Sequence, residues 1–389
     1  MAEYLILRDA SGTWQRGDSP GAGCLGAPVA ISRTKRRADP DISVAELDGT
    51  GLDELCADPS VLSIAPVMPT RLVSPEPLDD IRPEDVVPLW GLRETGALDC
   101  AYDGTGVTIA LLDTGIDAKH PAFSGVSPVF QDFVGSGMHD DHGHGTHCAA
   151  SILGRPLKGY RLGVATGIDA PLIGKVIADY GRGTSAMLFH GLQWALENGA
   201  AIIFLPAEFD TVTMSEALAA SGHPARLAAS VALNALNGNL GLMRTLLMLH
   251  QAGRDKTEAP LIVVPAGNNS RRTISPELTT AGTPMTAVPG VISVGALGYG
   301  EDGLTLASFS DLCPTLVAPG VGILSAAADS NLRALNGTTM AAACAAALWL
   351  QAQGEKRFVT RMLASARNTG MPGGQGPWHI GAGLVQAPR

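Results

Sequence analysis

Charged residues are scarce in this chain of 389 residues, at 16% of the total, and aromatic residues make up only 5%. The formal net charge is -10 and the pI is near 5.3, so no basic excess is present that could attract polyphosphate. Nucleic acid is therefore not an expected partner. The hydrophobic content of 46% is enough for a large core, which excludes disorder as the main state.

Long hydrophobic runs are also absent. The longest, Met340 to Leu350, is well short of the roughly 20 residues that cross a bilayer, so no membrane partner is expected. The N-terminus places Glu3 and Arg8 around a very short apolar patch, which lacks the order of a secretory signal. These features predict a cytoplasmic protein.

Cysteines are few and irregularly spaced, with no CxxC pair, which argues against a zinc knuckle or a dense disulfide framework. Most are expected to be buried free thiols. The six are Cys24, Cys56, Cys100, Cys148, Cys313 and Cys344. A GxGxxG pattern at residues 21–26 follows Pro20 and has no strand before it, so it does not predict a dinucleotide site, and no cofactor is expected.

The order of apolar and polar segments divides the chain into two units. Residues 1–74 read as a small α+β domain, with strands at YLILRD, ISVAEL and VLSIAPV and a short helix at LDELCAD. Residues 75–88 contain four prolines and several acids, which is typical of an extended linker. Residues 89–389 form the main domain.

The main domain alternates nearly continuous apolar runs with helical stretches. The apolar runs are VTIALLD, APLIGKV, AAIIFLP, PLIVVPAG and GVISVGAL. This order predicts an α/β fold of three layers, α/β/α, in which helices cover both faces of a central parallel sheet. Residues 214–253 predict an inserted helical hairpin, with breaks at residues 222–224 and 238–241.

Polar residues at the ends of the predicted strands are the candidates for chemistry, because functional groups of open parallel sheets gather there. Asp113 ends VTIALLD and either caps the next helix or orients a catalytic base. Asn268 follows PLIVVPAG and either closes a turn or donates its amide to an oxyanion. An Asp-Thr-Gly triplet also occurs in aspartic proteases, but those need two and this chain has one.

Three histidines lie close together in DDHGHGTHCAASILG, beside Asp140 and Asp141. His142, His144 and His147 are either zinc ligands or include one imidazole that acts as a base. The small residues around them predict a close-packed helix beginning near His144, on which the three rings do not converge easily. A base is the favoured interpretation, and no metal is expected.

The stretch NGTTMAAAC places a hydroxyl at the start of a predicted helix. Threonine there is either an N-cap or a hydroxyl held near unpaired N–H groups and a positive dipole, which favour negative charge. The choice between an N-cap and a catalytic hydroxyl depends on all the motifs taken together. In order, LLDTGID, GHGTHCA, VPAGNNS and NGTTMAA resemble the subtilisin-like serine proteases (subtilases, peptidase family S8), over most of residues 90–389.

This resemblance implies an endopeptidase that hydrolyses peptide bonds. Asp113 would orient His144, His144 would take a proton from the nucleophile at position 339, and Asn268 would hold the oxyanion. Gly181, Arg182 and Gly183 resemble the edge that pairs with an extended substrate. Pro265, Ala266 and Gly267 would form one wall of a substrate pocket. In the opposite wall, Pro206 lacks a backbone donor and Glu208 adds an acid that favours basic residues in the substrate.

Residues 1–74 resemble the inhibitory propeptide of the same family, of the I9 inhibitor type, which folds as a small sheet with two helices. In such zymogens the tail of the propeptide lies in the cleft as a product-like strand. Here residues 69–74 would be that tail, so the expected partners are a peptide or protein substrate and the chain's own N-terminal segment.

Thr339 departs from the family pattern, which has serine in Gly-Thr-Ser-Met-Ala. Threonine keeps the hydroxyl, but the added methyl restricts its rotamer and can crowd an incoming carbonyl. Three interpretations stay open: a slow protease, a pseudoprotease that binds peptides without cutting, and a chain whose nucleophile was exchanged to trap the uncleaved form.

Overall fold

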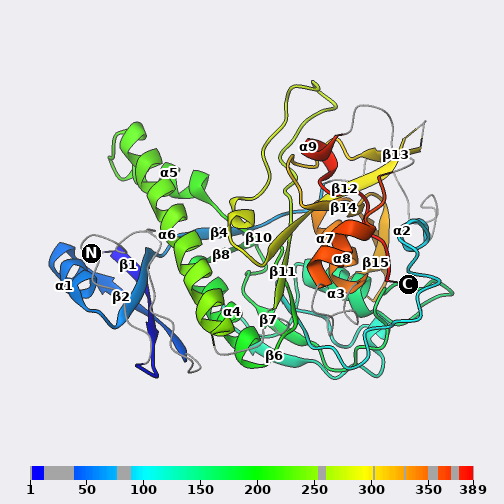
Figure 1. Ribbon diagram of the computed structural model, residues 1–389, viewed down its shortest axis with the longest axis horizontal. Helices are drawn as coiled ribbons and strands as arrows, with labels where there is room; N and C mark the ends of the chain where they lie inside the picture. The colour runs from blue at the N-terminus through cyan, green and yellow to red at the C-terminus, as the bar shows by residue number, and fades with distance from the viewer. Residues whose placement is uncertain are drawn as a thin grey trace.

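The computed structural model describes residues 2–12, 39–76, 89–252, 260–300, 303–327, 330–348, 358–368 and 376–388 (Figure 1). The GxGxxG pattern and residues 77–88 of the expected linker lie outside the described residues. So does Cys24.

The apolar runs of the main domain build one central sheet of eight strands, in the order β13-β12-β11-β9-β5-β7-β6 with β14 also beside β12. Every pair in it is parallel except β12 with β13. The strands are β5 (Ile109–Asp113), β6 (Val129–Asp132), β7 (Leu172–Lys175), β9 (Ile202–Phe204), β11 (Leu261–Pro265), β12 (Val291–Gly300), β13 (Gly303–Leu306) and β14 (Leu316–Pro319). The predicted parallel sheet is confirmed.

Helices cover both faces of this sheet, because alternate side chains of its strands point to opposite sides. Leu111 of β5 packs with α3 (His144–Leu153) and α7 (Thr338–Leu348) on one face. Leu112 packs with α4 (Ser185–Glu197) and α6 (Ala225–Gln251) on the other. Every residue of α7 is buried, which explains why its sequence is apolar all round rather than amphipathic. The three-layer prediction is therefore confirmed.

Shorter elements surround these layers. The helices are α1 (Gly49–Ala57), α2 (Trp90–Glu94), α5 (Thr211–Ala220), α8 (Phe358–Ser365) and α9 (Pro377–Ile380), with single 3-10 turns η2 (Pro121–Phe123) and η4 (Pro284–Ala287). The strands are β4 (Pro69–Leu72), β8 (Arg182–Thr184) and β10 (Ala207–Phe209), and the hairpin β15 (Ile323–Ala326) and β16 (Leu332–Leu335).

The helical hairpin predicted for residues 214–253 is formed by α5 and α6, which are separated at residues 221–224 as expected. The second predicted break, at residues 238–241, is wrong because α6 runs through it. Gly238 lies beside the N-terminal unit, where a Cβ would be in ordinary van der Waals contact with Ala65, 3.4 Å from its Cβ. The helix thus contains this glycine without ending at it, because tertiary contacts outweigh its low helix propensity.

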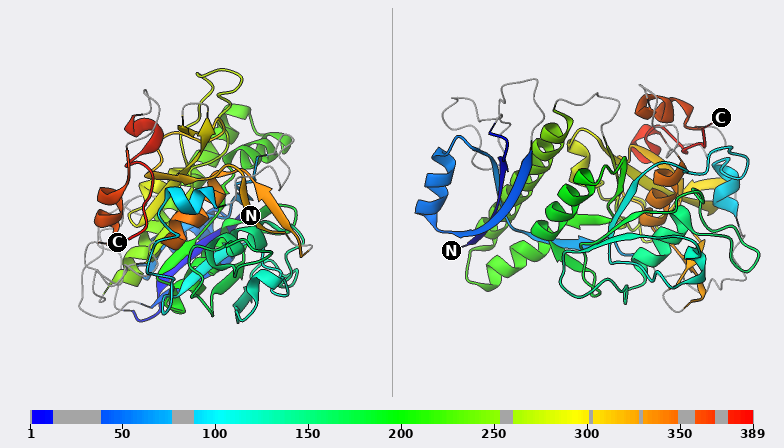
Figure 2. Two further views of the ribbon diagram at one scale, coloured as in Figure 1. Left: turned by 90° about the vertical axis from the view of Figure 1, so that its right-hand side faces the viewer. Right: turned by 90° about the horizontal axis from the view of Figure 1, so that it is seen from below.

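The N-terminal unit is the predicted α+β arrangement: β1 (Ala2–Asp9), β2 (Pro40–Leu47) and β3 (Val61–Pro66) form an antiparallel sheet in the order β2-β1-β3, with α1 beside it. One face of this sheet packs on α6, which lies between it and the central sheet (Figures 1 and 2). Leu5, Leu62 and Ala65 share a core with Ala235 and Leu242 of α6. The unit is therefore joined to the main domain through a continuous apolar core.

No helix in the described part of the chain combines the length and apolar character that a membrane span needs. The thiols differ in exposure: Cys148 and Cys344 are buried and free, Cys100 is half-buried and Cys313 is exposed. Cys56 is disulfide-bonded, so the expectation of free thiols does not extend to it.

We expect Asn239→Ala to destabilise the docking of the N-terminal unit by about 1 kcal/mol, because Asn239 Nδ2 donates to the Pro66 carbonyl oxygen (2.9 Å) at this buried contact. Asn237→Ala on the exposed side of α6 is the matched control, since it makes the same change in helix propensity. Urea denaturation compares the two variants, and equal free energies of unfolding would show that the Asn239 bond contributes nothing.

Candidate active site

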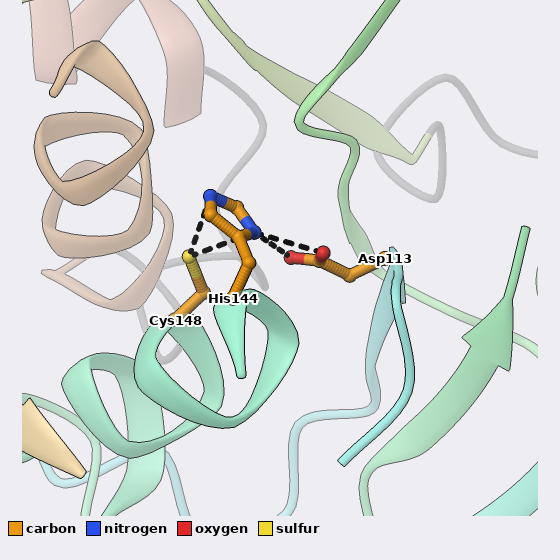
Figure 3. A group of neighbouring side chains, drawn as sticks. All are labelled: Asp113, His144 and Cys148. Atoms are coloured by element: carbon orange, nitrogen blue, oxygen red, sulfur yellow. Dashed lines mark hydrogen bonds and ion pairs between the residues drawn. The ribbon is translucent and has the colours of Figure 1, made fainter. Parts of the chain in front are cut away.

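Asp113 and His144 meet at the carboxyl edge of the central sheet. Asp113 is the last residue of β5 and His144 the first of α3, and His144 Nδ1 lies 2.9 and 3.0 Å from the two carboxylate oxygens of Asp113 (Figure 3). Both side chains are buried. A hydrogen on Nδ1 is the one that the carboxylate accepts, which leaves Nε2 as the basic nitrogen. The predicted orienting pair is thus brought together.

Asp140 fixes the position of this pair by binding the segments that carry it. Its carboxylate accepts hydrogen bonds from Thr114 Oγ1 (2.7 Å), Gly143 N (2.9 Å) and Thr146 N (2.8 Å), which ties the loop after β5 to the first turn of α3. Gly145 allows the close approach, because a Cβ there would lie 2.1 Å from the Gly115 carbonyl oxygen. From the sequence, Asp140 was recognised only as a neighbour of the histidines. Its positioning role depends on contacts such as that with Thr114, which the sequence does not show.

Asn268 has its side-chain amide fixed at both ends. Its Oδ1 accepts from Thr338 N (3.0 Å) and Thr338 Oγ1 (2.8 Å), and its Nδ2 donates to the Ser74 carbonyl oxygen (2.8 Å). The donor end therefore points at a peptide carbonyl in the cleft, as an oxyanion donor must. The role of Thr338 in orienting this amide was not recognised from the sequence.

Thr339 is buried in the first turn of α7. Its hydroxyl donates to Met340 Sδ (3.3 Å), and within the described chain no hydrogen bond joins it to His144. The Thr339 hydroxyl is thus directed to its neighbour Met340 rather than to His144. A β-branched side chain has few rotamers with which to correct this.

The three histidines do not form a metal site. His147 Nε2 lies 3.1 Å from the carbonyl oxygens of Ile323 and Arg333, away from His144, and burial lowers the pKa of His147 to about 3. Among the described residues, one group has metal-ligand spacing, Asp113, His144 and Cys148 (Figure 3). Burial raises the pKa of the Cys148 thiol well above its usual range, and Asp113 and Asp140 raise it further.

The N-terminal tail lies in a cleft between β8 and β10 of the main domain. Strand β4 lies between β8 and β10 and pairs with both in antiparallel fashion (Figure 1). Leu72 N donates to the Gly181 carbonyl oxygen (2.9 Å) and Val73 N to the Pro206 carbonyl oxygen (2.9 Å). Pro206 therefore retains the group that the peptide uses, despite its missing donor.

The remaining predicted residues lie around this strand. In the register of the β4–β8 pair, Arg182 and Gly183 are opposite Arg71 and Thr70. Of the predicted wall at 265–267, Ala266 lines a cavity beside Glu208, Pro265 ends β11, and Gly267 N donates to Thr338 Oγ1 (3.2 Å).

The tail continues past Ser74 along the main domain. Glu76 N donates to the Asn336 carbonyl oxygen (2.9 Å), and the Glu76 carboxylate lies 3.5 Å from Arg271 Nη2. Asn336, immediately before the Gly-Thr-Thr turn, was not singled out in the sequence. Ser74 is held by Asn268 and Glu76 by Asn336, so the Ser74–Pro75 peptide bond lies between two fixed points of the main domain.

Comparisons with known proteins agree with this geometry. A family model described as "Subtilase family" matches residues 104–361. The chain is 28% identical to Subtilisin-like protease 3 of Trichophyton equinum over 279 residues, and 26% identical to Subtilisin-like protease 6 of Trichophyton verrucosum over 266 residues. These matches cover 69% and 66% of this chain, and 60% and 56% of the relatives, so the chain spans somewhat over half of their length.

A solved structure, described as a cold adapted subtilisin-like serine proteinase, matches with a TM-score of 0.52 and 23% identity. The match covers 75% of this chain and 92% of that one. At this identity the likeness concerns the fold.

We expect the purified chain to hold no stoichiometric zinc and to keep its melting temperature in the presence of a chelator, because His147 Nε2 is bonded to backbone carbonyls and the environment of Cys148 raises the pKa of its thiol. Elemental analysis measures the zinc content, and thermal unfolding with and without EDTA measures the melting temperature. Bound zinc that disappears in a Cys148→Ala variant would overturn this prediction.

Proposed function

Because the chain belongs to the subtilase family, we propose that it is a serine-protease-type endopeptidase in which Thr339 is an attenuated nucleophile. The observation that carries the proposal is the buried Asp113–His144 pair together with an Asn268 amide that donates to a peptide carbonyl. A base and an oxyanion donor arranged around one peptide bond are what acyl transfer requires.

In the proposed reaction, His144 Nε2 takes the proton of Thr339 Oγ1 as that oxygen bonds to the substrate carbonyl carbon. Asp113 stabilises the imidazolium, and Asn268 Nδ2 donates to the oxygen as it becomes negative. His144 then gives its proton to the leaving nitrogen as the C–N bond breaks. Water releases the acyl group through the same base.

Attenuation follows from the direction of the Thr339 hydroxyl. It donates to Met340 Sδ, so reaction requires a rotation that brings Oγ1 to His144 and swings the methyl to another position. Misplacement of a reacting atom by about 1 Å costs on the order of 10²-fold in rate. A slow enzyme is the expected consequence.

The hydrogen bond from Thr339 to Met340 also favours a second candidate function, a protein that binds peptides without cleaving them. The cleft pairs fully with an extended strand and holds its carbonyl, and these functions do not need the hydroxyl of Thr339. The two candidates differ only in whether the rotated threonine can attack.

Pro75 adds a separate obstacle to self-cleavage. The nitrogen of the Ser74–Pro75 bond carries Cδ where other residues carry hydrogen, which crowds the side from which His144 would protonate the leaving group. Self-cleavage of the natural chain therefore says little about the nucleophile. Pro75→Ala removes this obstacle, and it leaves the Asn268 and Asn336 contacts to the main chain available.

We expect a chain carrying both Thr339→Ser and Pro75→Ala to cut itself after Ser74, and the Pro75→Ala chain to do so on the order of 10²-fold more slowly. Intact mass spectrometry over time measures the N-terminal fragment of residues 1–74. Labelling by a fluorophosphonate probe after cleavage reports the nucleophile independently.

The control is His144→Ala in the doubly substituted chain, which removes the base and should abolish both signals. If the Pro75→Ala chain stays intact while the double variant is cut, the peptide-binding candidate is favoured. If the double variant neither cuts nor labels, the endopeptidase proposal fails.

A further inference from the structure

A cavity of about 150 Å³ lies beside the cleft, between β10 and the loop at residues 280–284. Four charged side chains line it. Glu208, Asp210 and Asp311 are acids of the main domain, and Arg71 is a base of the tail. When the tail leaves the cleft, Arg71 leaves with it, so only carboxylates remain among these charged groups.

Two of these acids have partners that belong to the main domain. Asp210 accepts from Thr213 N (2.9 Å) as the N-cap of α5 and lies 3.2 Å from Arg182 Nη1. Asp311 accepts from Asn269 N (3.1 Å) and Ser270 N (2.8 Å), and from both of their side chains. These hydrogen bonds and the Arg182 contact do not involve the tail, although burial still raises the pKa of Asp311.

Glu208 depends on the tail. Its side chain is 15% exposed, and among the described residues its hydrogen-bond and ion-pair partners are Nε (2.7 Å) and Nη2 (2.6 Å) of Arg71. Burial raises the pKa of Glu208, and Arg71 opposes that rise. A buried carboxylate that loses its cation is strongly destabilised.

The pairing is fixed by strand register. Glu208 and Arg71 are directly opposite in the β4–β10 ladder, so their side chains lie on the same face of the sheet. Arg71 Nη2 also donates to Asn269 Oδ1 (3.2 Å), so the guanidinium bridges the two walls of the cleft. Lysine, with a single terminal nitrogen, can form fewer of these bonds.

We propose that Glu208 makes the cleft select peptides with a basic residue, arginine before lysine, three residues before the one whose carbonyl Asn268 holds. The proposal rests on the proposed function in one respect, that peptides other than the tail enter this cleft. It concerns recognition and does not depend on whether Thr339 attacks.

The first experiment uses the full chain and its own tail as the ligand. We expect Arg71→Glu to place two carboxylates together and to speed hydrogen exchange of the Leu72 and Val73 amides by at least roughly tenfold. A second change, Glu208→Arg, should restore slow exchange in the Arg71→Glu chain. Glu216→Arg, on the exposed side of α5, makes the same change in net charge and should restore nothing.

The second experiment measures selectivity in the Arg71→Glu chain, in which we expect the tail to be bound more weakly. The probes are dye-labelled peptides of the sequence of residues 69–74 (PTRLVS) and versions with lysine, leucine or glutamate in place of arginine. Fluorescence anisotropy should give tightest binding for arginine, with leucine and glutamate at least roughly tenfold weaker. Adding Glu208→Gln to the chain should remove most of this preference.

Unchanged exchange in the Arg71→Glu chain, equal binding of the four peptides, or a preference that survives Glu208→Gln would each overturn the proposal. These readouts measure binding with Thr339 in place, and the self-cleavage assay measures bond breaking with Arg71 and Glu208 in place. Selective binding without any cleavage would overturn only the endopeptidase proposal. Cleavage without selectivity would overturn only the proposal that Glu208 selects basic residues.

Discussion

The hydrogen bond from Asn268 Nδ2 to the Ser74 carbonyl oxygen is the contact on which the arrangement of this molecule depends. On one side, Thr338 fixes the amide and so couples it to the start of α7, where Thr339 lies. On the other side, the carbonyl belongs to Ser74, two residues after β4, which pairs with both β8 and β10. A single side-chain amide thus connects the N-terminal segment to the start of α7.

That alignment requires the N-terminal sheet to be held close to the cleft, and α6 provides the support. Gly238 and Asn239 form the contact with Ala65 and Pro66, and β4 begins shortly after β3 ends. Only two residues separate these strands, so docking of the sheet on α6 sets where the tail enters. Packing at the helix and peptide recognition in the cleft are therefore parts of one structure.

Chemistry-bearing residues at strand ends were predictable, because parallel strands bring their carboxyl ends to one edge. Asp113, His144 and Asn268 follow from that rule and from their motifs. The support around them was less accessible: Asp140, Thr338 and Asn336 act through contacts with residues distant in sequence. The expected break at residues 238–241 is wrong because two glycines lower helix propensity only modestly, and the packing of α6 against the N-terminal sheet keeps the helix continuous. Likewise, Glu208 was visible as an acid, but its dependence on Arg71 follows from strand register.

On the proposed mechanism, the two departures from an efficient protease act on different steps. Thr339 slows formation of the tetrahedral intermediate, because its hydroxyl points to Met340 rather than His144. Pro75 hinders collapse of that intermediate, because its nitrogen is crowded where the proton must arrive. Neither change disturbs ground-state binding, which is made by backbone pairing, the Asn268 amide and the Arg71–Glu208 ion pair. Strong binding of the ground state combined with weak stabilisation of the transition state favours retention of the tail over turnover. On this mechanism a peptide must displace the tail before it reaches His144, and a basic residue of the peptide would replace the ion pair that Arg71 of the tail forms with Glu208.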